Sequence, residues 1–464
     1  MQQLPLARCP EEAGVSSRGI LEYIAARAEA GIEPHALWVL RHGRVACRLT
    51  WAPYDDRTPH MLFSLSKSFC SAAAGFAVQE GLLSWDSRVL DVLADVAPEA
   101  PSPWLQGVTL HHLLTMGSGL RVESDEIRSG TDWARRALAC DCDHAPGTHY
   151  HYNSTGTYLV ACMVQKVTGL TVRDYLTPRL FVPLGILQDD GSAPDWDLSP
   201  DGVNMGGWGL WLSCAQIARF GQCLLQKGRW DGVQVLPREW LDRATVSQID
   251  NGNGEHPHDH DWNMGYGYQF WMCRTDHEPG QTPRYRGDGA LSQLCIVDER
   301  RDMVVCCVSG VPEIGKSLEL MYDHLLAAAD MPPADEATRA ELQRQLAALA
   351  YPWPEHDGSP VPAGEYVTGK GEPVLTIGPD FVTLSLSPEA TVTAPIGSTA
   401  THGSTMAGCG MQEGTLRLRG RMLNGPFTLE ATVRFADDMA EMTIGGIGVD
   451  ARTALLKRKK HGGR

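Results

Sequence analysis

The chain has 464 residues, too many for one ordinary domain, and this length predicts a large enzyme-sized core with a smaller module. Its formal net charge is -16 at pH 7. That charge argues against non-specific binding to nucleic acid or to an anionic membrane, because both polyanions would repel the protein.

The first eighty residues are predicted to form a helix, two strands and a second helix. The first helix covers residues 17–30, and the strands cover 36–40 and 44–49. Residues 64–81 are rich in Ala, Phe and Val and stop at a glycine, which is typical of a buried helix.

The region from residue 83 to about 237 is mainly helical, and strands return after it. Strands are predicted at 265–271, 294–297 and 303–308, and a helix follows at 316–329. The strands therefore come from both ends of this region, and the helices come mainly from its middle. This order predicts an α/β (α+β) fold, in which an antiparallel sheet flanked by helices lies beside an all-helical subdomain.

The last hundred residues are predicted to form a small all-β domain. Residues 351–362 are rich in proline and glycine, which marks a linker. Short alternating strands follow at 374–377, 381–386, 416–418, 427–435 and 441–447. We therefore expect a catalytic domain at 1–350, with its helical subdomain at about 83–237, a linker at 351–362, and an antiparallel β domain at 363–464.

Cysteine usage and the N-terminus both indicate the cytoplasm. The 13 cysteines, an odd number, are scattered from Cys9 to Cys409 and lie mostly inside apolar segments. The N-terminus lacks the basic start and the apolar run of a secretory signal. No segment reaches the roughly 18 apolar residues that span a bilayer. We expect a cytoplasmic protein with reduced thiols and no membrane partner.

Two clusters contain residue types that transition metals accept. One runs from Cys140 to His151, but one residue separates its two cysteines, whereas structural zinc sites use two to four. The other consists of His256, His258 and His260 in a stretch whose glycines and proline are typical of a surface loop. We expect neither a metal nor an organic cofactor, with metal binding as the minor alternative at each cluster.

Ser64 and Lys67 stand three residues apart where the second predicted helix begins. If the helix starts at or just before Ser64, Lys67 lies one turn further on, and its amine reaches the Ser64 hydroxyl. Serine is a poor nucleophile until an adjacent base removes its proton as it attacks a carbonyl. A Ser-x-x-Lys tetrapeptide occurs about once by chance in a chain of this size. The interpretation therefore depends on the surrounding segments.

Several segments follow this pair in a recognisable order. They are HLLTMGSGL at 112–120, Tyr152-Asn153-Ser154, and glycine-rich stretches at 206–210, 265–271 and 287–290. With them, residues 10–330 resemble the serine β-lactamase and penicillin-binding-protein superfamily, in particular the branch related to class C β-lactamases and family VIII esterases. The resemblance implies a serine β-lactamase-like fold for the catalytic domain.

The resemblance also implies the catalytic groups. Ser64 would be the nucleophile, Lys67 its partner and Tyr152 the second acid/base group, with a core aromatic residue as the alternative for Tyr152. The backbone N–H groups of Ser64 and Ala290 would form the oxyanion hole. We expect the lysine ammonium to lower the pKa of the phenol, so that the pair can carry a proton from Ser64 to the leaving group.

The second motif departs from the family pattern, which is usually Tyr-x-Asn. Here the third position is Ser154, a hydroxyl in place of an amide. In the lactamases the amide helps to hold the side chain of the β-lactam, so its loss weakens a lactamase assignment. Asn153 would replace it only if the loop is shifted.

The third motif, Lys-Thr-Gly or His-x-Gly in the family, is here Gly287-Asp288-Gly289 and lacks its cation. Asp288 would repel a substrate carboxylate or accept an amine or hydroxyl, with turn capping as an equal alternative. Arg286 compensates only if it turns inward, and a surface arginine at a strand edge is the favoured alternative. The candidate substrate-binding residues are therefore Asn153, Ser154, Trp208, Trp271, Arg286, Gly287, Asp288 and Gly289, with the tryptophans either lining an apolar pocket or belonging to the core.

These observations predict a cytoplasmic serine hydrolase of the esterase or amidase type, which cleaves a small ester or amide through an acyl-enzyme on Ser64. A β-lactamase, a D-amino-acid peptidase and an acyltransferase are the enzymatic alternatives. A degenerate scaffold that retains the fold is the non-enzymatic one. The expected partner is a small molecule, and the sequence is compatible with a homo-oligomer.

Overall fold

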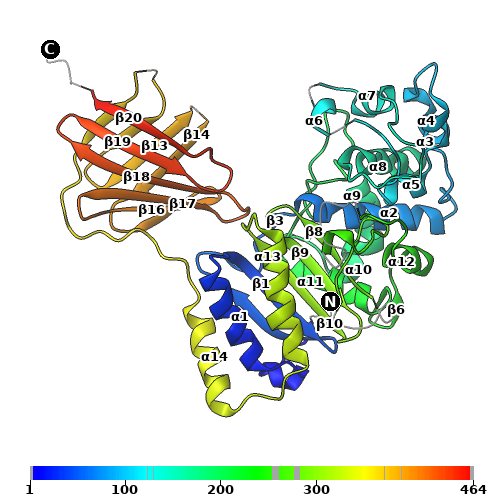
Figure 1. Cartoon of the computed structure of the whole chain (residues 1–464), viewed down its shortest axis with the longest axis horizontal. Helices are drawn as coiled ribbons and strands as arrows, with labels where there is room; N and C mark the ends of the chain where they lie inside the picture. The colour runs from blue at the N-terminus through cyan, green and yellow to red at the C-terminus, as the bar shows by residue number, and fades with distance from the viewer. Residues whose placement is uncertain are drawn as a thin grey trace. The chain divides into compact units, whose positions relative to one another are not determined.

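The computed structural model describes residues 4–122, 124–128, 130–252, 261–275, 283–369, 371–387 and 389–459. The chain divides into two compact units (Figure 1). The first contains Met1–Thr50 and Pro59–Ala348, and the second contains Trp51–Thr58 and Leu349–Arg464. The short segment that precedes the nucleophile region therefore belongs with the C-terminal unit.

The first unit is built on a six-stranded antiparallel sheet in the order β2-β1-β10-β9-β8-β7. Its strands are β1 (Pro34–Arg41), β2 (Arg44–Thr50), β7 (Trp271–Met272), β8 (Arg284–Gly289), β9 (Gln293–Asp298) and β10 (Met303–Ser309). Strands from the two ends of the catalytic region thus pair directly, β1 with β10. The predicted strand at 265–271 is reduced to the two residues of β7.

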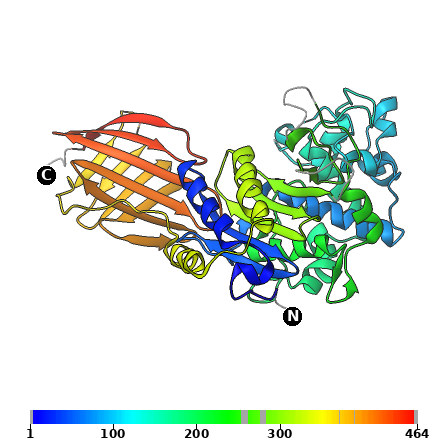
Figure 2. The ribbon, with the colours of Figure 1, turned by 60° about the horizontal axis from the view of Figure 1, so that its bottom comes forward.

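Helices cover both faces of this sheet. On one face, α11 (Cys214–Leu225) packs so closely that a Cβ on Gly221 would lie 2.6 Å from Val304 Cγ1. On the other face, α1 (Ser17–Glu29) lies beside α13 (Ile314–Leu320) and α14 (Glu336–Ala348) (Figures 1 and 2). The sheet is therefore the middle layer of a three-layer core.

The helices between β2 and β7 form the region that carries the nucleophile segment (Figure 1). The longest of them, α2 (Ser66–Gln79) and α8 (Ser154–Thr168), pack against each other. The shorter helices are α3 (Val89–Val92), α4 (Pro103–Gly107), α5 (Leu110–Leu114), α6 (Ser124–Ile127), α7 (Trp133–Ala139), α9 (Val172–Leu176), α10 (Val182–Leu184) and α12 (Arg238–Ala244). Two-stranded pairs join β3 (His60–Met61) to β4 (Trp211–Leu212) and β5 (Arg229–Trp230) to β6 (Val233–Gln234).

The second unit is a ten-stranded antiparallel sheet whose two ends approach each other as in a barrel. The order is β14-β13-β12-β11-β20-β19-β18-β17-β16-β15, and β14 also contacts β15 and β16. Its strands are β11 (Gly364–Val367), β12 (Val374–Ile377), β13 (Phe381–Ser387), β14 (Ala390–Pro395), β15 (Thr399–His402), β16 (Thr405–Gln412), β17 (Thr415–Met422), β18 (Thr428–Ala436), β19 (Met439–Gly445) and β20 (Arg452–Arg458). The mixed first unit and this all-β second unit confirm the predicted α/β (α+β) fold class with a C-terminal all-β domain.

Residues 51–58 join the second unit through backbone pairing. The Ala52 N–H donates to Leu349 O at 3.0 Å, and the Tyr351 N–H donates to Ala52 O at 2.8 Å. Trp51 is fully buried. Within the described ranges, none of the helices of either unit is long and apolar enough to cross a bilayer.

Candidate functional site

Ser64 lies in a single 3-10 turn, Phe63–Leu65, that continues directly into α2. The turn begins with Phe63 at φ +47°, a left-handed conformation that a bulky side chain rarely adopts. Strain of this kind concentrates at functional sites, where the surrounding structure enforces it. The predicted helix start at Ser64 is thus a strained turn, and α2 itself begins two residues later, at Ser66.

Lys67 is the buried partner of Ser64, with 1% of its surface exposed. Its Nζ lies 2.9 Å from Ser64 Oγ, 2.9 Å from Ser154 Oγ and 2.8 Å from Gly207 O. Burial lowers the pKa of Lys67 to about 7, and the Asp288 carboxylate opposes this shift. Near neutral pH the amine is therefore poised between its charged and neutral forms.

The three partners of Lys67 limit the directions in which a neutral amine can point its lone pair. A backbone carbonyl only accepts, so Gly207 O takes one N–H, and the second goes to the hydroxyl of Ser154 or of Ser64. When Ser154 accepts it, the lone pair faces Ser64 Oγ. The arrangement is that of a base aligned with the serine proton.

Tyr152 belongs to the same group, because Ser64 acts on the titration of its phenol. The Lys67 Nζ lies 4.8 Å from the centroid of its ring. The expected lowering of the phenol pKa is wrong. Burial, aided by the Asp288 charge, raises the pKa of Tyr152, and Ser64 only partly opposes the rise. Tyr152 therefore enters the site as a neutral proton donor.

Ser154, not Asn153, occupies the position beside the lysine. The Asn153 side chain accepts from the N–H groups of Thr155 and Gly156, which caps α8, and it donates to Leu120 O and Val122 O. Both ends of the amide are thus occupied by backbone groups. This corrects the expectation that Asn153 contacts the substrate.

The two glycines of the third motif allow β8 to lie directly against the nucleophile turn. A Cβ on Gly289 would lie 2.0 Å from Leu62 O, and one on Gly287 would lie 2.5 Å from Leu65 Cδ1. A lysine in place of Gly287 would not fit this contact. The glycines therefore allow the backbone of β8 to lie close to the nucleophile turn.

This approach brings Ala290 to the same turn as Ser64. Neither the Ser64 N–H nor the Ala290 N–H donates a hydrogen bond to any residue that the structure describes. Two free backbone donors beside a serine hydroxyl are what an oxyanion hole requires.

Arg286 and Asp288 form a buried ion pair on the opposite face of β8 from the glycines. Arg286 Nε donates to Asp288 Oδ2 at 2.8 Å, and Arg286 Nη1 donates to Cys273 Sγ at 3.4 Å. No part of the Arg286 side chain is exposed. The favoured interpretation of Arg286 as a surface arginine is therefore wrong, and Asp288 pairs with a cation rather than capping a turn.

Trp271 and Trp208 have separate surroundings. Trp271, on β7, stacks on Tyr152 with ring centroids 5.4 Å apart and an interplanar angle of 23°. Trp208 instead packs beside Trp133, at 6.4 Å between centroids, with the Arg128 guanidinium 4.3 Å from its ring. Only Trp271 is brought together with the catalytic candidates by these contacts.

Sequence reasoning missed Trp262 and the carbonyl of Gly207. Trp262 packs edge-on against Trp271, with centroids 4.8 Å apart, and its ring lies 4.8 Å from the Arg286 guanidinium. The sequence before Trp262 is polar and gives no periodic signal. A backbone acceptor such as Gly207 O leaves no signal in a side-chain pattern either.

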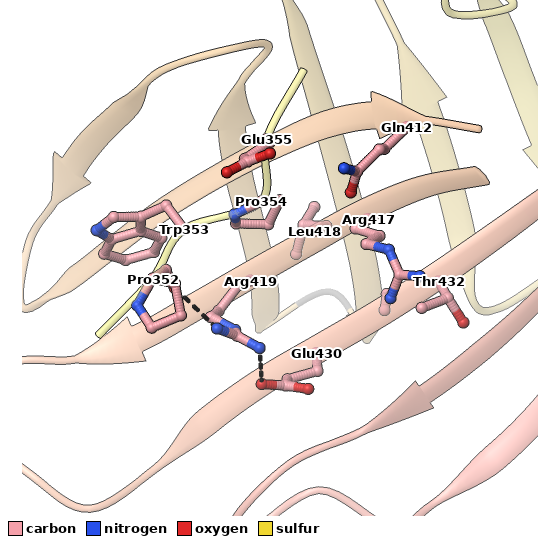
Figure 3. A pocket seen from close by; sticks show the side chains of 11 residues that line it. Pro352, Trp353, Pro354, Glu355, Gln412, Arg417, Leu418, Arg419, Glu430 and Thr432 are labelled. Atoms are coloured by element: carbon pink, nitrogen blue, oxygen red, sulfur yellow. Dashed lines mark hydrogen bonds and ion pairs between the residues drawn. The ribbon is translucent and has the colours of Figure 1, made fainter. Parts of the chain in front are cut away.

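A separate pocket of about 410 Å³ lies in the second unit (Figure 3). Residues 352–355 form one side of it, and β16, β17 and β18 form the other. Across it, Arg419 donates to Pro352 O at 2.8 Å and pairs with Glu430 at 2.8 Å. None of the catalytic candidates lies in this pocket.

The structure describes only the first of the two metal-ligand clusters. Among the described residues, no group of three or more His, Cys, Asp or Glu side chains is placed to hold a metal ion. His144 and His149 of the first cluster stack on each other, with ring centroids 3.9 Å apart. His256, His258 and His260 lie outside the described residues.

Two curated relatives align with the region that contains this site. An uncharacterized protein of Alkalihalophilus pseudofirmus is 29% identical over 208 residues, which cover 42% of this chain and 57% of that relative. The chain thus spans little more than half of that protein. The 6-aminohexanoate-dimer hydrolase of Paenarthrobacter ureafaciens is 25% identical over 300 residues, which cover 60% of this chain and 73% of the hydrolase.

Solved structures share the fold at lower sequence identity. An octameric penicillin-binding protein homologue of Pyrococcus abyssi matches with a TM-score of 0.51 and 18% identity, over 95% of this chain and 99% of that one. A family VIII carboxylesterase matches with a TM-score of 0.51 and 15% identity, over 66% of this chain and 96% of the esterase. The sequence profile of the β-lactamase family matches residues 22–329, most of the chain, and on this match the protein belongs to the β-lactamase family.

Proposed function

We propose that the protein is a serine hydrolase that cleaves a small ester or amide through an acyl-enzyme on Ser64. The observation that carries the proposal is the Lys67 amine. It is buried, its pKa is lowered to about 7, and it lies 2.9 Å from the Ser64 hydroxyl with its other two partners placed as acceptors. A buried lysine that loses its proton near neutral pH has the properties of a general base.

In the proposed reaction, Lys67 takes the Ser64 proton as Ser64 Oγ attacks the carbonyl carbon. The N–H groups of Ser64 and Ala290 stabilise the negative charge on the carbonyl oxygen. Tyr152, which burial keeps neutral, protonates the leaving group and recovers its proton from Lys67. Water then attacks the acyl-enzyme, with the same groups acting in reverse. These steps use side chains and backbone groups alone.

The third motif favours an ester or amide over a β-lactam or a D-peptide with a free carboxylate. Gly287 leaves no room for the cation of the family motif, and Asp288 adds a negative charge. The relative from Paenarthrobacter is named a dimer hydrolase, and one structural neighbour is named a carboxylesterase. A lactamase, a peptidase and an acyltransferase remain the enzymatic alternatives, and a scaffold remains the non-enzymatic one.

The experiment is active-site labelling, followed by turnover of p-nitrophenyl acetate. Intact mass after exposure to a fluorophosphonate should increase by one adduct in the wild type and remain unchanged in Ser64→Ala. Ser68→Ala is the matched control, because Ser68 lies on α2 and its hydroxyl donates to Gln269 O, not to the catalytic group. This variant should still gain the adduct. Ester turnover that persists in folded Ser64→Ala contradicts the proposal, and a wild type that neither labels nor turns over any ester favours the scaffold.

We also propose a cytoplasmic location and self-association of the chain. Most of the 13 cysteines are buried, which suits a reducing compartment, and the Pyrococcus homologue is octameric. Light scattering on the purified protein tests the assembly: a monomeric mass across a hundredfold range of concentration contradicts it.

A further inference from the structure

The Asp288 carboxylate has one oxygen held in place and one oxygen free. Oδ2 accepts from Arg286 Nε at 2.8 Å, whereas Oδ1 accepts no hydrogen bond from any described residue. The side chain is 6% exposed, and Oδ1 is not among the fully enclosed polar atoms that lack a partner. The free oxygen is thus desolvated for the most part, fixed in position and open to a ligand.

This oxygen lies at the catalytic group. Asp288 shares its face of β8 with Arg286, and Arg286 pairs across the strands with Trp271, which stacks on Tyr152. The Asp288 charge also acts on the titration of both Lys67 and Tyr152. One substrate molecule could therefore place a group at Asp288 while Ser64 attacks its carbonyl.

The surroundings favour a cation over an anion. Arg286 bonds to Asp288 and Cys273, and its Nη2 is fully enclosed, so no part of the guanidinium is open to an anion. The Asp261 carboxylate adds a second negative charge whose field reaches both residues. Aromatic rings lie next to the ion pair: the Arg286 guanidinium faces Trp262 at 4.8 Å and Trp271 at 5.6 Å, and Tyr150 packs against Trp271 with centroids 6.0 Å apart. Aromatic faces attract cations, and the free Asp288 oxygen beside them adds a hydrogen-bond acceptor for an ammonium group.

We propose that Asp288 binds an ammonium group of the substrate, so that the protein's substrates are esters or amides carrying a protonated amine near the scissile carbonyl. This inference rests on the proposed hydrolase function and names its substrate class. Arg286 is the positioning residue that holds the Asp288 carboxylate and leaves its second oxygen for the substrate.

The first test uses the wild-type protein and two series of substrates that differ only in one terminal group. For the acyl side, these are the γ-aminobutanoyl, pentanoyl and glutaryl p-nitroanilides. For the leaving-group side, they are the acetate esters of tyramine, 4-propylphenol and 3-(4-hydroxyphenyl)propanoate. In at least one series, kcat/KM should be greatest for the cation and smallest for the carboxylate, with about a tenfold to hundredfold advantage of cation over neutral analogue, the range of one charge-assisted hydrogen bond.

The second test removes the charge. Asp288→Asn should abolish the advantage of the cationic substrate while it still turns over the neutral one. Because this variant leaves Arg286 buried without its counter-charge and is liable to unfold, the neutral pair Arg286→Gln with Asp288→Asn is measured beside it. Asp302→Asn, an exposed carboxylate on the β9–β10 turn, is the matched control and should keep the full preference.

The outcomes separate this inference from the proposed function. If neutral substrates are hydrolysed through Ser64 and neither series prefers its cationic member, the inference is overturned and the hydrolase stands. If a preference exists but survives in a folded Asp288 variant, the ammonium binds elsewhere and the inference is again overturned. If no substrate is turned over and Ser64 takes no label, the proposed function itself has failed.

Discussion

The protonation of Lys67 should set the acid limb of the activity profile. With a pKa of about 7, about half of the amine is neutral at pH 7, about one tenth at pH 6 and about one hundredth at pH 5. Only the neutral amine accepts the Ser64 proton. The kcat/KM for a neutral ester should therefore fall about tenfold for each pH unit below about 6 and level off above about 8.

Initial rates with p-nitrophenyl acetate between pH 5 and pH 9, at constant ionic strength, measure this limb. Full recovery of activity on return to pH 8 separates titration from unfolding. Asp288→Asn provides the check on assignment: its carboxylate raises the pKa of Lys67, so its removal should move the limb to lower pH. A profile that is flat down to pH 5, or one that rises only above pH 9, would refute the role of Lys67 as the base.

Three further predictions concern stability and packing. Burial lowers the pKa of Lys67 from 10.5 to about 7, so between these two pH values the unfolded chain binds more protons than the folded one. The free energy of unfolding of the wild type, measured relative to Lys67→Met in urea titrations, should therefore rise by about 2 kcal/mol from pH 7 to pH 9. Gly289→Ala, whose Cβ would lie 2.0 Å from Leu62 O, should cost about 3 kcal/mol and most of the ester turnover. Gly315→Ala, in α13 with open space around it, should raise stability by up to about 1 kcal/mol and leave turnover unchanged. Asn153→Ala should lower stability by about 1 to 3 kcal/mol in the same titrations but preserve the pH profile, because the amide caps α8 and does not reach Lys67.

The sequence predicts the local features of the site because short-range geometry determines them. A serine and a lysine three residues apart at a helix start can reach each other in any context, and they do so here at 2.9 Å. The Asn153 cap was also readable, since an asparagine before an apolar helix is a common N-cap, although the family motif drew attention to substrate contact instead.

Features that depend on distant segments could not be predicted. Arg286 is buried because β7 and Trp262 cover it, and nothing in its neighbours along the chain indicates that cover. The raised pKa of Tyr152 results from burial and from a carboxylate 136 positions further along, not from the adjacent lysine that sequence reasoning considered. The several C-terminal strands outside the predicted ones, such as β16, are rich in Gly, Ala and Thr, which have no strong apolar alternation.

Asp288 connects substrate choice to the catalytic base through its charge. The free carboxylate stabilises the Lys67 ammonium, so an ammonium group bound at Asp288 would cancel that stabilisation and lower the pKa of Lys67 further. For a cationic substrate, the acid limb of kcat, which reports the bound enzyme, should then lie at lower pH than the limb of kcat/KM, which reports the free enzyme. For the neutral analogue the two limbs should coincide. Parallel profiles for both substrates measure the difference, and limbs that coincide for the cationic substrate would show that its charge is not bound at Asp288.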